Sequence, residues 1–89
     1  MTRYIVPKEI VFNDIDNGAF IYNSKTEMCF GLDEVALSIW KMIHAGESVG
    51  SIVRNIQNKY TQDEALVERD VNDLIDRLVE HSLLIALDD

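Results

Sequence analysis

The fold is decided by the stretch from Ile21 to Trp40, which reads IYNSKTEMCFGLDEVALSIW. Its first part joins short β-prone runs by a polar turn, a pattern typical of neighbouring strands. After Leu32 the apolar residues recur three or four positions apart, which predicts a helix. Asp33 stands at this change and is a residue type that caps helix N-termini. The chain therefore changes from strands to helices near residue 32.

Before this change, turn signals separate three β-prone runs. Asn17-Gly18 is a strong turn pair because both residues tolerate a positive φ. Gly31 weakens the third run slightly but lets another backbone come close. The pattern predicts a three-stranded antiparallel meander, with strands at about 9–13, 19–23 and 28–32.

After the change, the apolar spacing predicts three amphipathic helices, at about 34–45, 49–60 and 64–81. Gly46 is suited to end the first helix and Ser48 to begin the second. Either Thr61, as part of a capping box, or Asp63 begins the third. Residues 83–87 form either a short closing strand or an apolar tail on the core. We expect a single α+β domain over residues 1–89, winged-helix-like, with a three-stranded antiparallel sheet followed by three helices.

Charge limits the partners. The 89 residues carry sixteen acidic and eight basic side chains, a net charge of −8. A negative charge of this size disfavours binding to nucleic acid or to anionic membranes, because proteins bind both chiefly through Lys and Arg side chains. Nine acids and two bases follow residue 62, so one end of the molecule is acidic and the rest is nearly neutral. The N-terminus lacks a signal-peptide pattern, and Cys29 is the only cysteine, so we expect a cytoplasmic protein without disulfides.

No catalytic motif is present. The acidic pairs that begin at Asp33 and at Asp63 stand at predicted helix starts, where carboxylates favour the helix dipole. Cys29 has no cation beside it in sequence, so we interpret it as an inert thiol. His44 and His81 show no metal-ligand spacing, and both are expected on the surface near helix C-termini. We therefore expect no enzyme activity, no cofactor and no metal. The larger aromatic residues fall at core spacings and are expected in the core: Phe20, Tyr22, Phe30 and Trp40.

The third predicted helix has two shoulders beside its buried stripe. At about 100° per residue, one shoulder carries Asp70, Leu74, Arg77 and His81. The other shoulder carries Glu68, Asn72 and Val79. The acidic outer face of this helix serves either solubility or contact with a cationic partner.

Three classes of small protein fit parts of this description. An acyl carrier protein matches the length and acidity, but the first helix opens without the serine that carries its prosthetic arm. A winged-helix transcriptional regulator matches the elements, but its recognition helix is basic, whereas residues 64–81 are the most acidic part of the chain. An adaptor whose acidic helix docks a basic partner is the third class. A mobility-shift assay and the salt dependence of binding distinguish the last two.

The order of these features resembles the PqqD-like family, the RiPP recognition elements of ribosomal peptide biosynthesis. The resemblance rests on the stretch 21–40, on Gly46, on the helix to Tyr60 and on the Asp70-Val71 helix, and it spans about residues 9–85. Two positions depart from the family pattern: Asp33 stands where Asn is usual, and Ser82 where Gly often precedes the last Leu-Leu.

The resemblance implies a non-catalytic peptide chaperone that binds the leader segment of a precursor peptide by strand addition. It would present that precursor to a modifying enzyme such as a radical SAM protein or a lasso-type protease and cyclase. By the same resemblance, the pairing edge is Met28, Cys29, Phe30, Gly31 and Leu32. The opposite wall is Asp70, Leu74 and Arg77. If the leader pairs with this edge, Phe30→Pro should abolish leader binding.

Overall fold

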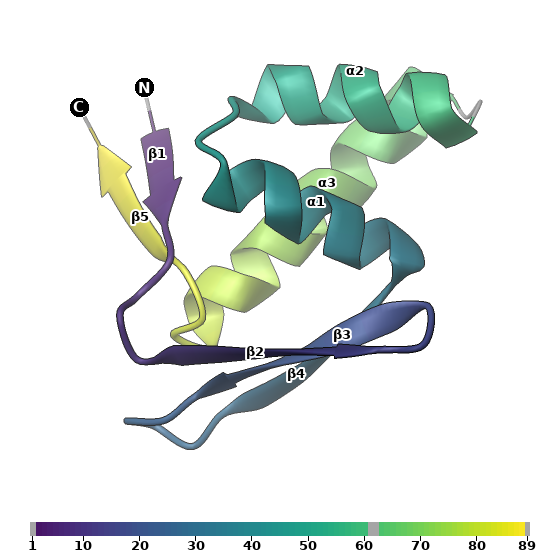
Figure 1. The fold of residues 1–89 in the computed structure, drawn as a ribbon. Coiled ribbons are helices and arrows are strands. Elements are labelled where there is room, and N and C mark those ends of the chain that lie inside the picture. The colour runs from purple at the N-terminus through teal and green to yellow at the C-terminus, as the bar shows by residue number, and fades with distance from the viewer. Residues whose placement is uncertain (1, 61–62, 89) are drawn as a thin grey trace.

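Three helices lie on one side of a three-stranded antiparallel sheet in the computed structural model, which describes residues 2–60 and 63–88 (Figure 1). The first of them packs on the sheet, and the second packs on the other two helices. The strands are β1 (Thr2–Ile5), β2 (Ile10–Ile15), β3 (Gly18–Asn23), β4 (Cys29–Asp33) and β5 (Ile85–Asp88). The helices are α1 (Glu34–His44), α2 (Val49–Tyr60) and α3 (Glu64–Glu80). The order in the larger sheet is β2-β3-β4. The predicted winged-helix-like α+β arrangement is confirmed.

A second, two-stranded sheet joins the chain ends. β1 pairs antiparallel with β5, with Arg3 opposite Leu87 and Ile5 opposite Ile85. In Figure 1 the two strands lie side by side, and both termini are at their outer ends. From the sequence, residues 83–87 could form either a short strand or an apolar tail, and the structure shows the strand β5 there. No strand was predicted at β1. A strand whose partner lies 80 or more residues away leaves no turn signal beside it.

Side-chain caps begin the helices where the chain predicts them. The Ala36 amide donates to Asp33 Oδ1 at 2.8 Å, and the Ser51 amide donates to Ser48 Oγ at 3.2 Å. Asp63 caps α3 by accepting from the Ala65 amide at 2.9 Å, whereas the alternative cap, Thr61, lies outside the described residues. These bonds satisfy amide groups that no helical carbonyl can reach. They fix where each helix leaves the preceding segment.

The core lies between the larger sheet and the helices. Odd-numbered residues of β3, such as Ala19 and Ile21, face the helices and are buried, while even-numbered residues face away. Trp40 is buried as predicted, and Tyr22 and Phe30 are half-buried. The prediction for Phe20 was wrong: it is 45% exposed, because strand alternation places it on the outer face.

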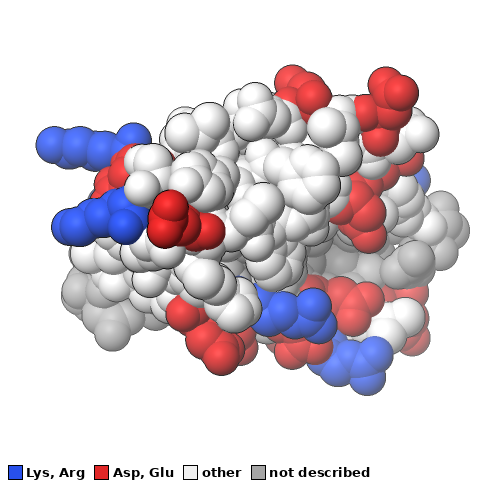
Figure 2. Space-filling view, turned by 90° about the horizontal axis from the view of Figure 1, so that it is seen from below, with Lys and Arg blue, Asp and Glu red and all other residues white. Residues whose placement is uncertain are grey.

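The outer face of the sheet carries few charges. Figure 2 views this face and shows uncharged atoms over its centre, with most charged side chains toward its margin. Val11, Ile15 and Phe20 are its exposed apolar residues. The ring of Phe20 lies against Gly31 on the adjacent strand, where an added Cβ would be 3.4 Å from Phe20 Cε1. Gly31 thus makes room for the ring of Phe20 on the outer face of the sheet.

One buried polar side chain ties the sheet to the C-terminal segment. Asn23 is 3% exposed, and its Nδ2 donates to the Ser82 carbonyl at 2.7 Å. Its Oδ1 accepts from the amides of Lys25 at 2.9 Å and Thr26 at 3.1 Å. Ser82 has a φ of 61°, a left-handed conformation that favours glycine. The departure from the family's usual Gly at this position is therefore accommodated, at some cost in backbone strain.

Candidate functional site

The outer edge of β4 has no neighbouring strand within residues 2–60 and 63–88. β4 pairs only with β3, which in turn pairs with β2 on its other side. An edge strand presents main-chain N–H and C=O groups that lack a ladder partner, and another chain can pair with them. The segment that the resemblance assigns to leader pairing therefore lies on an open edge.

The hydrogen-bond register shows which residues of β4 use this edge. The Asn23 amide donates to the Met28 carbonyl at 2.8 Å, so these two residues form a hydrogen-bonded pair. Such pairs alternate along an antiparallel ladder, so Phe30, opposite Ile21, bonds inward to β3. Cys29 and Gly31 then direct their N–H and C=O groups outward. The choice of Phe30→Pro as an edge-blocking change was therefore wrong, because proline there would break the ladder to β3.

The side chains of this edge differ in exposure. Met28, Cys29 and Gly31 are exposed, and Cys29 is a free thiol. Phe30 is half-buried, and Leu32 belongs to the core. The outward main chain therefore comes from Cys29 and Gly31, while Phe30 and Leu32 hold the strand on the core.

One shoulder of α3 reaches this edge at its C-terminal end. The rings of Phe30 and His81 lie with their centroids 6.3 Å apart, tilted by 41°. Arg77, Leu74 and Asp70 precede His81 by four, seven and eleven residues, so they follow the same side of the helix. Leu74 is half-buried against the core, and Asp70 and Arg77 are exposed. The Phe30–His81 contact thus favours the shoulder chosen from the sequence.

The other shoulder of α3 faces a different part of the molecule. Val79 lines a pocket of about 470 Å³ together with Pro7, Ser82 and Leu84. These residues belong to the β1–β2 connection and to the segment before β5. The chain itself therefore covers this side near the end of the helix, which leaves the His81 side toward β4.

Leu66, one turn before Asp70, extends this row and was not predicted from the sequence. Leu66 is 40% exposed, and its spacing of four and eight residues from Asp70 and Leu74 continues their row. Extending the helical spacing toward the start of α3 would have found it. The row therefore alternates apolar and charged side chains, from Leu66 through Asp70 and Leu74 to Arg77.

The charges on this row are in contact with water. Arg69 Nε and Asp70 Oδ1 are 3.9 Å apart, and both side chains are more than half exposed. An exposed pair of this kind contributes little to stability, so Asp70 remains able to exchange partners. α3 carries six acidic and two basic residues, which makes Arg77 a local positive charge on an acidic helix.

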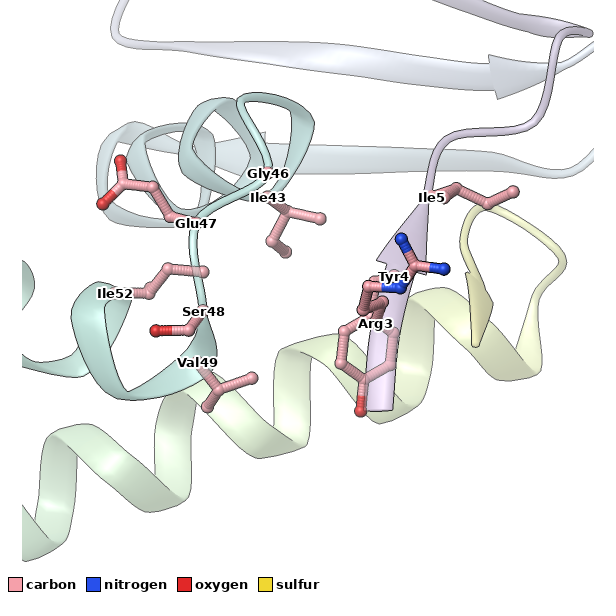
Figure 3. A pocket seen from close by; sticks show the side chains of 9 residues that line it. All are labelled: Arg3, Tyr4, Ile5, Ile43, Gly46, Glu47, Ser48, Val49 and Ile52. Atoms are coloured by element: carbon pink, nitrogen blue, oxygen red, sulfur yellow. The ribbon is translucent and has the colours of Figure 1, made fainter. Parts of the chain in front are cut away.

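A separate pocket lies away from the β4 edge, between β1 and the α1–α2 connection. It has a volume of about 350 Å³. In Figure 3, Ile43 and Val49 point from the helices toward Tyr4, whereas Glu47 points away. This pocket lies along the seam between the small sheet and the helices, and none of its lining residues belongs to β4 or α3.

Known proteins share this arrangement. The family described as coenzyme PQQ synthesis protein D (PqqD) matches residues 18–84, which contain β3, β4 and all three helices. The chain belongs to the PqqD family. A search of curated proteins found no match.

Two solved structures are similar to this PqqD-family chain over nearly its whole length. "TbiB1 in Complex with the TbiA(beta) Leader Peptide" is 31% identical, with a TM-score of 0.85, covering 94% of this chain and 98% of TbiB1. "Lasso peptide synthetase B1 complexed with the leader peptide" is 21% identical, with a TM-score of 0.83, covering 97% and 99%. At that identity the second similarity shows the fold alone. In the described part of this chain, no helix has the length and apolar character needed to span a membrane.

Proposed function

We propose that this chain binds the leader segment of a ribosomally made precursor peptide and presents it to a modifying enzyme. Membership of the PqqD family and the similarity to TbiB1, whose structure contains a leader peptide, support this function. The open edge of β4 is the observation that carries it, because strand addition needs unpaired main-chain groups. The modifying enzyme belongs to the radical SAM or lasso-type protease and cyclase classes.

The leader lies as an additional strand beside β4. Cys29 and Gly31 provide outward N–H and C=O groups, so alternate residues of the leader pair with them. Successive leader side chains then point to opposite faces of the extended sheet. Those on the helix side lie between Phe30 and the row on α3. Main-chain pairing supplies affinity that tolerates changes of leader sequence.

The α3 row selects the leader. Leu66 and Leu74 provide apolar surface, and burying a leader side chain there contributes about 25 cal/mol per Å² of apolar area. Arg77 favours a leader carboxylate, and Asp70 favours a leader cation about two helical turns away. A leader with apolar and charged residues at alternate positions along the helix side fits this order.

The role is binding, not catalysis. The two acidic pairs that could suggest acid–base chemistry begin at Asp33 and Asp63, and both of these carboxylates cap helices. A carboxylate held by backbone amides at a helix start serves the fold. In this proposal the chemistry of maturation belongs to the enzyme that receives the bound precursor.

Fluorescence anisotropy with a labelled leader tests this function. The leader is identified first, by searching the reading frames that neighbour the gene for a short precursor, and a scrambled peptide of equal composition is the control. We expect saturable binding of the leader alone, with amide protection at Cys29 and Gly31 in hydrogen exchange. Equal binding of the scrambled peptide would refute selective leader recognition. Protection confined to residues outside β4 would refute the strand-addition mode.

A further inference from the structure

β2 forms the second open edge of the same sheet. β2 pairs only with β3 in the described part of the chain. The Ser24 amide donates to the Glu9 carbonyl at 3.0 Å, and this pair sets the alternation along the ladder. Phe12 and Asp14 consequently direct their main-chain groups away from β3. The edge can therefore accept a strand at the position of Phe12.

A pocket adjoins this edge between β2 and α1. Its volume is about 300 Å³, and its lining residues are Val6, Ile10, Phe12, Trp40, Lys41 and His44. Trp40 is 2% exposed and lines this pocket. Phe12 lies opposite the buried Ile21, on the helix side of the sheet, yet it is 37% exposed. An inward aromatic ring with this exposure has an uncovered side, which a further apolar side chain would bury.

The β2 edge and this pocket together form a groove, and the charged residues at its two ends differ in sign. Lys41 and His44, in the last turn of α1, stand at the pocket. Asp14 lies two residues beyond Phe12 on the same side of β2 and is exposed. In a chain of net charge −8, an apolar pocket beside a lysine is a local exception. A carboxylate on the bound segment is attracted to the Lys41 end and repelled at the Asp14 end.

We propose that β2 and α1 form a docking groove for an extended segment of the modifying enzyme. That segment carries a large apolar side chain next to an Asp or Glu. It pairs with the edge at Phe12, fills the pocket above Trp40 and places its carboxylate at Lys41. This assignment rests on the proposed leader-binding function, which supplies the need for such a partner.

The two edges can be occupied at the same time. β3 separates β2 from β4, so the edges are two strand spacings, roughly 10 Å, apart. The enzyme segment would extend the same sheet that the leader extends on its other side. A second copy of this chain is a poorer occupant, because each copy brings a net charge of −8.

Small-molecule binding tests the chemistry of the groove. Hydrocinnamate, an aromatic carboxylate, is titrated into isotope-labelled protein, and amide and indole shifts are followed by NMR. We expect shifts at Phe12, Trp40 and Lys41, at least fivefold weaker binding by Lys41→Glu, and no change in Arg54→Glu, an exposed site on α2 with the same charge change. Equal binding of neutral hydrocinnamamide, or shifts confined to other elements, would overturn the assignment.

A maturation assay tests the partner. The modifying enzyme that acts on the identified precursor is purified, and it processes that precursor in the presence of wild type, Lys41→Glu, Phe12→Ser or Arg54→Glu. We expect Lys41→Glu and Phe12→Ser each to lower the processing rate at least fivefold relative to wild type, with leader affinity unchanged. Arg54→Glu should process the precursor at the wild-type rate. Unchanged processing overturns the docking groove and leaves leader binding standing. A loss of leader affinity in the same variants overturns it as well, because the leader itself would then use β2. Failure of wild type to bind leader refutes the proposed function instead.

Discussion

Replacing Cys29 with proline should close the outer edge of β4 while preserving the fold. The Cys29 amide points outward, so proline removes no bond to β3. The Met28 carbonyl, which accepts from the Asn23 amide at 2.8 Å, is retained. Cys29 is the first residue of an edge strand, a position where proline is tolerated. The substitution therefore acts on the incoming leader, not on the domain.

The expected loss of affinity follows from the main-chain geometry. One outward N–H is removed, and a typical hydrogen bond contributes about 0.5–1.5 kcal/mol net. The pyrrolidine ring also occupies the space of the leader carbonyl that would have accepted this bond, which leaves that carbonyl buried without a donor. About 1.4 kcal/mol corresponds to a tenfold change in Kd. We expect the Kd of the leader to rise by about tenfold or more.

Anisotropy with the labelled leader measures this change, and Cys29→Ala is the matched control because it alters the thiol but keeps the N–H. Phe30→Pro provides the contrast. It removes the bond toward Ile21 and the ring contact with His81, so it should lower Tm strongly. A folded Cys29→Pro protein with the leader affinity of Cys29→Ala would refute pairing at this edge.

Three further predictions concern the wall and the fold. Leu74→Ala and Arg77→Glu should each weaken leader binding at least threefold with little change in circular dichroism; full affinity in both would place the leader away from this row. Asn23→Ala removes three hydrogen bonds, so it should lower the free energy of unfolding, measured by thermal denaturation, by about 2–4 kcal/mol. A loss no greater than that of an exposed control, Asn13→Ala, would contradict this role. Ser82→Gly should stabilise by about 0.5–1 kcal/mol, because glycine adopts a φ of 61° without strain; a lower Tm would argue against strain at this residue.

The helices and the starts of the first two could be predicted from local sequence, whereas for the third the sequence offered both Thr61 and Asp63 as caps. Asp33, Ser48 and Asp63 are side chains that bond amides two or three residues away, so their effect does not depend on the rest of the fold. The same holds for the turn at Asn17, whose φ is 60°. Interactions of this range depend only on residues close together in the sequence. This is why the three strands of the larger sheet and the three helices could be predicted.

The roles of particular strand residues depended on tertiary structure. Phe20 is a large apolar residue of the kind usually found in a core. It is exposed only because the helices pack on the other face of the sheet. Phe30 and Cys29 are neighbours in the sequence, yet the ladder to β3 turns one amide inward and the other outward. The choice between the two shoulders of α3 likewise needed the contact between Phe30 and His81.

The sequence by itself determined an acidic α+β domain with capped helices, because propensity, capping and charge act over a few residues. The tertiary structure decided that β1 pairs with β5, that β2 and β4 are the open edges of the larger sheet among the described residues, and that Phe30 of β4 lies beside His81 at the end of α3. These features arise from pairing between segments distant in the chain. Local sequence does not encode such pairing, because the free energy of each strand edge depends on which other segment covers it.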